Sequence, residues 1–270
     1  MDHNAPVGVF DSGIGGLTVA REIMRQMPEE KLIYFGDTAR VPYGNKSSDT
    51  VVRYSRQIIR FLQTKNVKAI VIACNTATSY ALETIQKELE IPVIGVIHAG
   101  AKTAVESTRN GKIGVIGTEG TIRSGIYTEV MRQMRSNIEV TTKACPLLVP
   151  LVEEGLLHDS VTDEIASRYL SNLKSRYIDT LVLGCTHYPL LRSAIGRLMG
   201  DEVVLVNPAY ETAVELKQLL SEKQLLGSCT DKESQYQFYV SDLAEKFTAF
   251  ATSILPNEVK ETRQINIEEF

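Results

Sequence analysis

The sequence lacks tryptophan, has only four cysteines and four histidines, and carries no strong excess of either charge. A formal net charge of −4 in 270 residues offers no bulk attraction to nucleic acid or to an anionic membrane surface. No apolar run approaches the roughly 18 residues of a membrane-spanning helix, and no basic start followed by an apolar stretch indicates export. We therefore expect a cytoplasmic protein that binds neither nucleic acid nor a membrane.

The cysteines, at positions 74, 145, 185 and 229, are too scattered for a disulfide framework and form no C-x-x-C pair of the kind that holds zinc. With so few histidines as well, we expect no metal site. Hydrophobic residues make up 43% of the chain and charged residues 23%, which is typical of a globular protein with a sizeable core and excludes a disordered one.

Short β-branched apolar runs alternate along the chain with segments of helical periodicity, including segments around residues 17–27, 51–62, 122–134 and 211–226 and one with Leu243, Phe247 and Phe250. This alternation predicts the α/β class, with mainly parallel sheets covered by helices on both faces. The predicted strands are Val7–Phe10, Leu32–Phe35, Ala69–Ala73, Val93–Ile97, Ile113–Ile116, Thr180–Gly184, Val203–Val206 and Gln237–Val240.

The strand pattern also repeats. VGVFDSG at residue 7 is similar to IGVIGTEG at 113, AIVIACNTAT at 69 to TLVLGCTHYP at 180, and VIGVI at 93 to VVLV at 203. Three matches in one order and at nearly one spacing predict two similar halves rather than a solenoid, whose repeats are far shorter. The segment after Asn207 does not fit this repeat, and either closes the second half or returns to the first.

Two cysteines stand at matching positions in the two halves. Cys74 follows one predicted strand, Cys185 follows another, and each precedes a segment that we interpret as the start of a helix. Ligands of open α/β sheets bind at the carboxyl ends of the strands, and a helix N-terminus lowers the pKa of a thiol toward neutrality. A thiol in such a place is a candidate base, nucleophile or metal ligand, and His187 beside Cys185 is a candidate proton-transfer group.

Polar residues near other predicted strands are weaker candidates. In the segment Asp11–Gly16 three glycines allow a carboxylate or phosphate to approach the backbone, and Asp11 is a candidate general base or orienting group. Tyr43, in the loop after the second strand, is either a ligand donor or a packed anchor of the loop. Glu153 and Glu154 follow an apolar run, and each is either a candidate functional carboxylate or part of a solvated helix face, which we favour for Glu154.

The motifs FDSGIGGLTV, FGDTARVPYG, ACNTAT and LGCTHYPLL, in this order, resemble the glutamate racemases of the aspartate/glutamate racemase superfamily, from about residue 7 to residue 215. The resemblance implies two α/β domains related by a pseudo-twofold axis, with the active site in the cleft between them. Residues 1–97 and 208–270 would form the first domain, and residues 98–207 the inserted second domain. Asn207 departs from the family, which more often has aspartate there.

The same resemblance implies the chemistry: interconversion of L- and D-glutamate, without pyridoxal phosphate, other cofactor or metal, to supply D-glutamate for peptidoglycan synthesis. A cytoplasmic homodimer is also implied. In the family, the thiol matching Cys74 deprotonates D-glutamate and the one matching Cys185 deprotonates L-glutamate, with Asp11 and His187 assisting. The implied substrate contacts are Asp11, Ser12, Tyr43, Gly44, Asn75, Thr76, Thr186 and His187, with Thr118 and Thr121 from the second domain.

Two thiols suit a racemisation because one group removes the α-proton from one face of the carbon while the other returns a proton to the opposite face. If each sulfur approaches the α-carbon to about 3–3.5 Å, the two sulfurs should lie about 6–7 Å apart around the substrate. The alternatives are a racemase of aspartate, another amino acid or a hydantoin, a non-catalytic two-lobe binding protein, and a cysteine hydrolase that uses Cys185 and His187.

Overall fold

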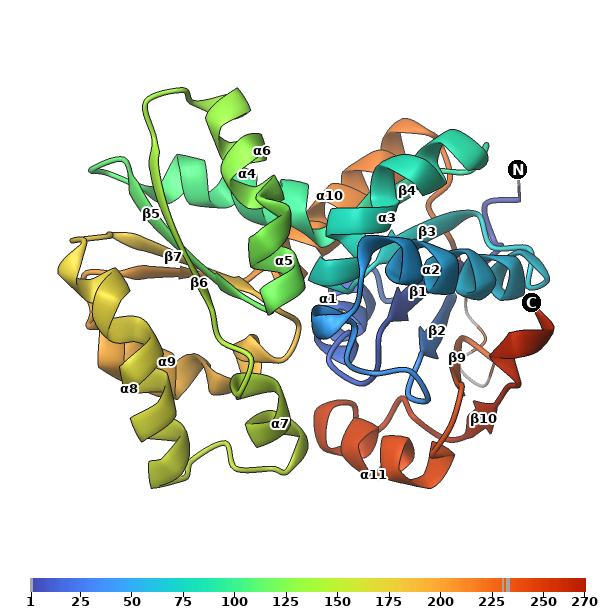
Figure 1. Cartoon of the computed structure of the whole chain (residues 1–270). Coiled ribbons are helices and arrows are strands. Elements are labelled where there is room, and N and C mark those ends of the chain that lie inside the picture. Colours follow the sequence, from blue (N-terminus) through green and yellow to red (C-terminus); the bar gives the residue numbers. More distant parts are fainter. Residues whose placement is uncertain (1, 230, 232–233) are drawn as a thin grey trace.

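Two parallel sheets form the frame of the molecule (Figure 1). The computed structural model describes residues 2–229, 231 and 234–270. A six-stranded sheet has the order β10-β9-β2-β1-β3-β4, a four-stranded sheet has the order β6-β5-β7-β8, and all the pairings in both are parallel. The predicted α/β class is therefore confirmed.

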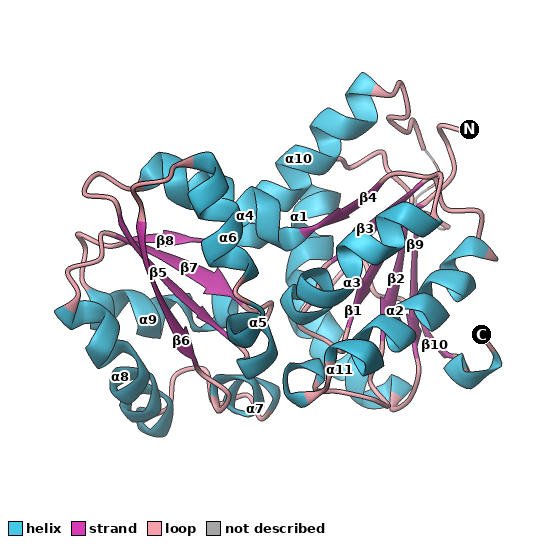
Figure 2. Ribbon diagram, turned by 45° about the horizontal axis from the view of Figure 1, so that its top comes forward, coloured by secondary structure: helices cyan, strands magenta, loops and turns pink. Residues whose placement is uncertain are grey.

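The central strands are continuous apolar runs, as expected where helices cover both faces of a parallel sheet (Figure 2). The strands of the six-stranded sheet are β1 (Val7–Asp11), β2 (Leu32–Gly36), β3 (Ala69–Ile72), β4 (Val93–Gly95), β9 (Tyr236–Val240) and β10 (Thr262–Gln264). Those of the four-stranded sheet are β5 (Lys112–Gly117), β6 (Glu139–Ala144), β7 (Thr180–Gly184) and β8 (Val204–Val206).

Eleven helices occur in the described part of the chain, and none of them is both long enough and apolar enough to cross a membrane. Several begin at a polar cap, as α2 does at Ser47, whose side chain accepts a hydrogen bond from the Thr50 N–H. The helices are α1 (Leu17–Gln26), α2 (Ser48–Gln63), α3 (Asn75–Glu88), α4 (Val96–Ser107), α5 (Glu119–Ser124), α6 (Ile126–Met134), α7 (Leu148–Glu153), α8 (Ser160–Ser175), α9 (Arg192–Met199), α10 (Pro208–Glu222) and α11 (Ala244–Ile254).

Two predicted elements differ from the structure. The strand predicted over Val93–Ile97 is wrong at its end, because β4 stops at Gly95 and α4 begins at Val96; a short buried apolar run fits a strand and a buried helix equally well. The periodicity over 122–134 is divided between α5 and α6, because Gly125, with a φ of 71°, ends one helix and begins the next.

Two strands were not predicted. β6 and β10 are edge strands of their sheets, β6 is mainly polar and half-exposed, and β10 has only three residues, so neither shows an apolar strand pattern. In Figure 1 the C-terminal elements, coloured red, lie beside the blue N-terminal strands, and β9 pairs with β2. The tail therefore returns to the first half, which is one of the two alternatives that the sequence left open. The exact domain boundaries stay predictions.

The helices α4 and α10 join the two halves. α4 leads from the six-stranded sheet toward the four-stranded one, α10 leads back, and the two pack against each other (Figure 1). One cluster of buried apolar residues runs through this junction, from Val9 and Val71 on one side to Val115 and Val182 on the other, with Ala213 of α10 between them. The halves thus share this cluster, while each half also has a second cluster of its own.

A buried ion pair lies at the amino ends of β2 and β3 in the six-stranded sheet. Lys68 Nζ, on a side chain with no exposed area, donates to Glu30 Oε2 at 2.6 Å and to the His3 carbonyl oxygen at 2.6 Å. We expect Lys68→Met to lower the free energy of unfolding by about 3–5 kcal/mol, because it leaves a carboxylate buried without its counter-charge. Urea denaturation followed by circular dichroism measures this loss.

The double variant Lys68→Met/Glu30→Leu should lose less stability than the sum of the two single variants, because it removes both charges together. Strictly additive losses would contradict this account and assign the effect to packing alone.

Candidate active site

The two predicted cysteines both lie, nearly fully buried, at the carboxyl end of a central strand. Cys74 follows β3 and caps α3, where its Sγ accepts a hydrogen bond from the Ala77 N–H at 3.4 Å and donates to Ser12 Oγ at 3.7 Å. Cys185 follows β7, and its Sγ lies 3.8 Å from His187 Nδ1. The repeated strand pattern therefore does place a thiol at the matching edge of each sheet.

The local surroundings of the two thiols differ from the prediction. Burial raises the pKa of Cys74 to about 12, with further contributions from the charges of Asp11 and Cys185, although the Ala77 N–H opposes the shift. The expected lowering by the helix N-terminus is thus wrong for Cys74, because desolvation outweighs it. After Cys185 the chain enters a 3₁₀ turn, Tyr188–Leu191, before α9 begins at Arg192, so Cys185 is not at a helix N-terminus.

Asp11 connects the two halves from the end of β1. Its carboxylate is fully buried, and accepts hydrogen bonds from the Gly13 N–H at 2.9 Å and from Thr186 Oγ1 at 3.3 Å. Burial raises the pKa of Asp11, and the charge of His187 partly opposes this. Glycine is required at position 15, where a Cβ would lie 2.4 Å from Thr186 Oγ1 and 2.5 Å from His187 Nδ1. This close approach brings the Asp11 loop against the Cys185 segment.

His187 is buried between a thiol and a carboxylate. Its Nδ1 faces Cys185 and its Nε2 lies 3.1 Å from Glu153 Oε1. Burial alone would lower the pKa of His187, but its hydrogen bonds with Cys185 and Glu153, together with the negative charges of Cys185 and Asp11, raise it to about 10. An imidazole with this pKa is protonated near neutral pH, and its positive charge faces the Cys185 sulfur.

Glu153 is a site residue that the sequence left undecided. Of its two alternatives the structure has the functional one, because α7 turns the carboxylate toward His187, with 25% of the side chain exposed. Glu154 is exposed, as interpreted. No local signal distinguishes the two neighbouring glutamates, because only the packing of α7 beside the 3₁₀ turn after His187 decides which one faces the imidazole.

Three threonine hydroxyls from the two halves meet at the same edge. Thr76 Oγ1 lies 2.8 Å from Thr118 Oγ1 and 3.2 Å from Thr121 Oγ1. Gly44 lies against Thr118. The Tyr43 hydroxyl donates to the buried carboxylate of Asp37, so the structure favours the loop anchor over the ligand donor for this side chain.

Asn75 lies beside the second thiol although it comes from the first half. Asn75, Thr186 and Cys185 line one small cavity of about 10 Å³. Asn207, where the family more often has aspartate, caps α10 by accepting a hydrogen bond from the Ala209 N–H at 3.1 Å. Because aspartate and asparagine cap helices about equally well, this departure leaves the site unchanged.

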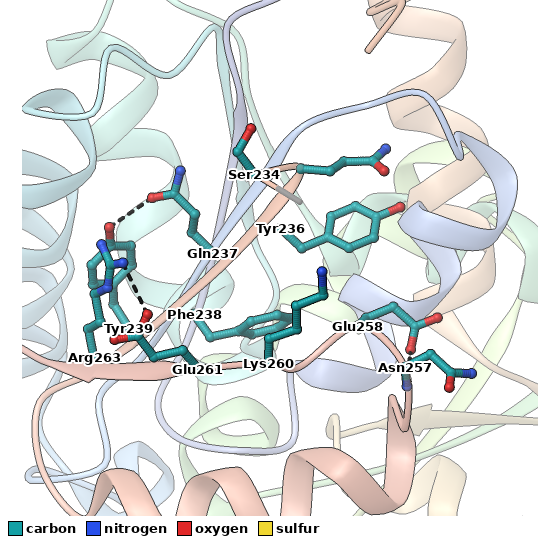
Figure 3. A pocket seen from close by; sticks show the side chains of 11 residues that line it. Ser234, Tyr236, Gln237, Phe238, Tyr239, Asn257, Glu258, Lys260, Glu261 and Arg263 are labelled. Carbon is teal, nitrogen blue, oxygen red and sulfur yellow. Dashed lines mark hydrogen bonds and ion pairs between the residues drawn. The ribbon is translucent and has the colours of Figure 1, made fainter. Parts of the chain in front are cut away.

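Two further cavities among the described residues are lined by none of the predicted catalytic residues or substrate contacts. The cavity in Figure 3, of about 540 Å³, follows β9 and the segment before β10 and is lined by Tyr236, Phe238 and Lys260 among others. A cavity of about 280 Å³ between the Asp11 loop, Glu153 and α11 borders the site. Among the described residues, no group of three or more His, Cys, Asp or Glu side chains is arranged to hold a metal ion.

Two sheets joined by helices, with a cysteine at the carboxyl end of a central strand in each, define a two-lobed α/β protein. Residues 15–215 match the model of the family described as Asp/Glu/Hydantoin racemase. The chain belongs to this family.

The similar proteins include glutamate racemases from several bacteria. The one from Geobacter metallireducens is 48% identical over 262 residues, which cover 97% of each chain. Among solved structures, a glutamate racemase isoform from Bacillus anthracis has a TM-score of 0.93 at 39% identity, over 97% of this chain and 98% of that one. The Francisella tularensis glutamate racemase in complex with D-glutamate has a TM-score of 0.92 at 38% identity, over 99% and 100%.

Proposed function

We propose that this protein is a cofactor-independent glutamate racemase, an isomerase that transfers the α-proton of glutamate between Cys74 and Cys185. The observation that carries the proposal is the unequal setting of two buried thiols at matching strand ends. Cys74 has a pKa of about 12 and holds its proton, whereas Cys185 faces a protonated imidazole. One acid and one base on opposite sides of a carbon are what a two-base racemisation needs at the start. The names of the similar proteins support glutamate as the substrate.

In this scheme the Cys185 thiolate accepts the α-proton of L-glutamate, and Cys74 gives its proton to the opposite face of the carbon, which yields D-glutamate. Cys185 is then the thiol and Cys74 the thiolate, so the pair is set for the reverse reaction. His187 would hold the negative charge of Cys185. Asp11 would act on Cys74 through its own charge, which makes the Cys74 thiolate the stronger base.

The α-proton of glutamate is a weak acid because it lies beside a carboxylate that becomes still more negative as the proton leaves. Fixed hydrogen-bond donors must therefore stabilise the developing charge. The structure offers the amide of Asn75 and the N–H groups of the first turn of α3 beside the thiols, and the hydroxyl of Thr186 would join them by turning its proton from Asp11 to the substrate. The hydroxyl cluster of Thr76, Thr118 and Thr121 would bind a substrate carboxylate, and the Ser12, Tyr43 and Gly44 loops would line the same space.

The direct test is to incubate the purified protein with L-glutamate in deuterated buffer, without added cofactor. The circular dichroism of glutamate should decay to zero, while deuterium enters the α-position. L-Aspartate at the same concentration should react much more slowly, and the reverse preference would identify a different racemase of the superfamily. Binding of glutamate without α-hydrogen exchange would instead indicate the non-catalytic binding protein, and would refute the proposal.

The biological setting belongs to the same proposal. D-Glutamate made in the cytoplasm would supply peptidoglycan synthesis, and the protein would act as a homodimer. Light scattering of the purified protein measures the oligomeric state, and a monomer at working concentration would contradict that part.

Glu153 should set the upper pH limit of activity through His187. Its hydrogen bond is one of the contacts that raise the pKa of His187 to about 10, and activity requires the protonated imidazole, so activity should fall as pH rises through that pKa. Glu153→Gln lowers the pKa of His187, and the alkaline limb of the kcat/KM profile should move to lower pH. We expect a loss of about 10-fold at about pH 9, and little change at neutral pH. Glu154→Gln is the matched control, and an equal shift in it would contradict this role.

A further inference from the structure

We propose that Tyr127 is a positioning residue, which holds the Asn75 side chain so that its Nδ2 donor faces the substrate. The inference rests on the proposed function, in which Asn75 donates to a substrate carboxylate. It adds a residue from the second half of the molecule that sets the direction of a donor from the first half.

The contact joins elements that are distant in sequence. Tyr127 lies on α6, which follows the four-stranded sheet, and Asn75 is the first residue of α3, which follows the six-stranded sheet. The Tyr127 hydroxyl donates to Asn75 Oδ1 at 2.7 Å, in a buried setting, and the tyrosine itself is only 2% exposed. The Tyr127 ring packs against Gly184, since a Cβ at Gly184 would lie 3.2 Å from Tyr127 Cε2. The Tyr127 ring therefore contacts the residue that precedes Cys185 in the sequence.

An amide side chain needs such a partner because its two ends are nearly the same size and opposite in hydrogen-bonding character. If Oδ1 faced a substrate carboxylate, two acceptors would meet in a buried site. Tyr127 occupies Oδ1, and this leaves Nδ2 as the end of the amide that can donate to a ligand, on a side chain that lines the same small cavity as Cys185 and Thr186. A phenol is suited to this task because it keeps its proton. Burial, and to a smaller extent the charge of Cys185, raises the pKa of Tyr127, so the hydroxyl remains a hydrogen-bond donor.

The position of Asn75 in the helix strengthens the argument. Cys74 caps α3, and Asn75 is the next residue, so the backbone that carries the thiol also carries the amide. The Tyr127 hydrogen bond therefore joins the second half to the residue next to Cys74, at the start of α3.

A double-mutant cycle tests the inference. Tyr127→Phe removes one oxygen atom and should lower kcat/KM for L-glutamate about 10-fold, which corresponds to one lost hydrogen bond. In an Asn75→Ala background the same substitution should change kcat/KM less than about twofold, because the amide that it positions is gone. Equal losses in the two backgrounds, or no loss in the Tyr127→Phe single variant, would overturn the proposal.

Tyr239→Phe is the matched control. The Tyr239 hydroxyl also donates to an amide oxygen in a half-buried setting, Gln237 Oε1 at 2.8 Å, in the cavity away from the cysteines (Figure 3). This variant should keep kcat/KM within about twofold of the original chain. A loss equal to that of Tyr127→Phe would show that removal of any such hydroxyl disturbs the protein, and would also overturn the proposal.

A second readout separates this inference from the proposed function. In ¹⁵N-labelled protein without substrate, the side-chain NH₂ resonances of Asn75, assigned through their absence in Asn75→Ala, should move in Tyr127→Phe and stay in place in Tyr239→Phe. Unmoved resonances in Tyr127→Phe would refute the positioning role whatever the reaction is. Moved resonances in a protein that does not racemise glutamate would support the contact and refute the function.

Discussion

Cys74→Ala and Cys185→Ala should each lower the rate of glutamate racemisation by about 10³-fold or more, because each removes one of the two groups that exchange a proton with the α-carbon. The two thiols act as a pair, so the double variant should lose little more than either single variant. The decay of the circular dichroism of L-glutamate and of D-glutamate measures both directions.

The single variants also test which thiol serves which face of the carbon. Cys74→Ala keeps the Cys185 base, so it should still exchange the α-hydrogen of L-glutamate with deuterated solvent, without inversion. Cys185→Ala should do the same with D-glutamate only. The opposite pattern would reverse the assignment, and full racemisation by either variant would refute the two-base mechanism.

Cys229→Ala is the control for these substitutions. Cys229 is a buried thiol as well, but it lies in the tail, where its N–H donates to the Glu29 carbonyl oxygen at 2.9 Å at the amino end of the six-stranded sheet. Its removal should leave the rate of racemisation within about twofold. This comparison separates loss of a buried sulfur from loss of a proton-transfer group.

His187→Asn should lower kcat/KM by about 10²-fold, because it removes the positive charge that faces Cys185 and the proton-transfer group itself. The original chain should lose activity as pH rises through about 10, the pKa of His187, and this alkaline limb should be absent from the variant. Because L- and D-glutamate have equal free energies in solution, kcat/KM must fall by the same factor in both directions, which provides an internal check.

His98→Asn is the matched control for His187→Asn. His98 also pairs with a glutamate, with Nδ1 3.5 Å from Glu215 Oε2, but it lies exposed on α4, away from the thiols. We expect no change in the pH profile of this variant. An alkaline limb that persists unchanged in His187→Asn would contradict the assignment of that limb to His187.

Much of the site was predictable because its residues occupy strand ends. Cys74 and Cys185 follow continuous apolar strands, and the carboxyl ends of parallel strands meet at one edge of a sheet, so the alternating pattern alone predicts that both lie where ligands bind. The segment Asp11–Gly16 follows the first strand in the same way. The prediction of a lowered pKa for Cys74 was wrong. A helix N-terminus can be predicted from the local sequence, but the burial that raises the pKa of the thiol cannot.

The pattern of apolar residues along a segment shows which residues face a core. From that pattern, the sequence alone determined the α/β class, the duplicated strands and the positions of the two thiols at strand ends. Which side chain of one element touches which of another depends on how the two sheets pack around α4 and α10, and periodicity contains no information about that. Glu153 meets His187 across 34 residues and Tyr127 meets Asn75 across 52, and both pairs were decided by tertiary structure alone. The same holds for the polar edge strands β6 and β10, whose neighbours, rather than their composition, make them strands.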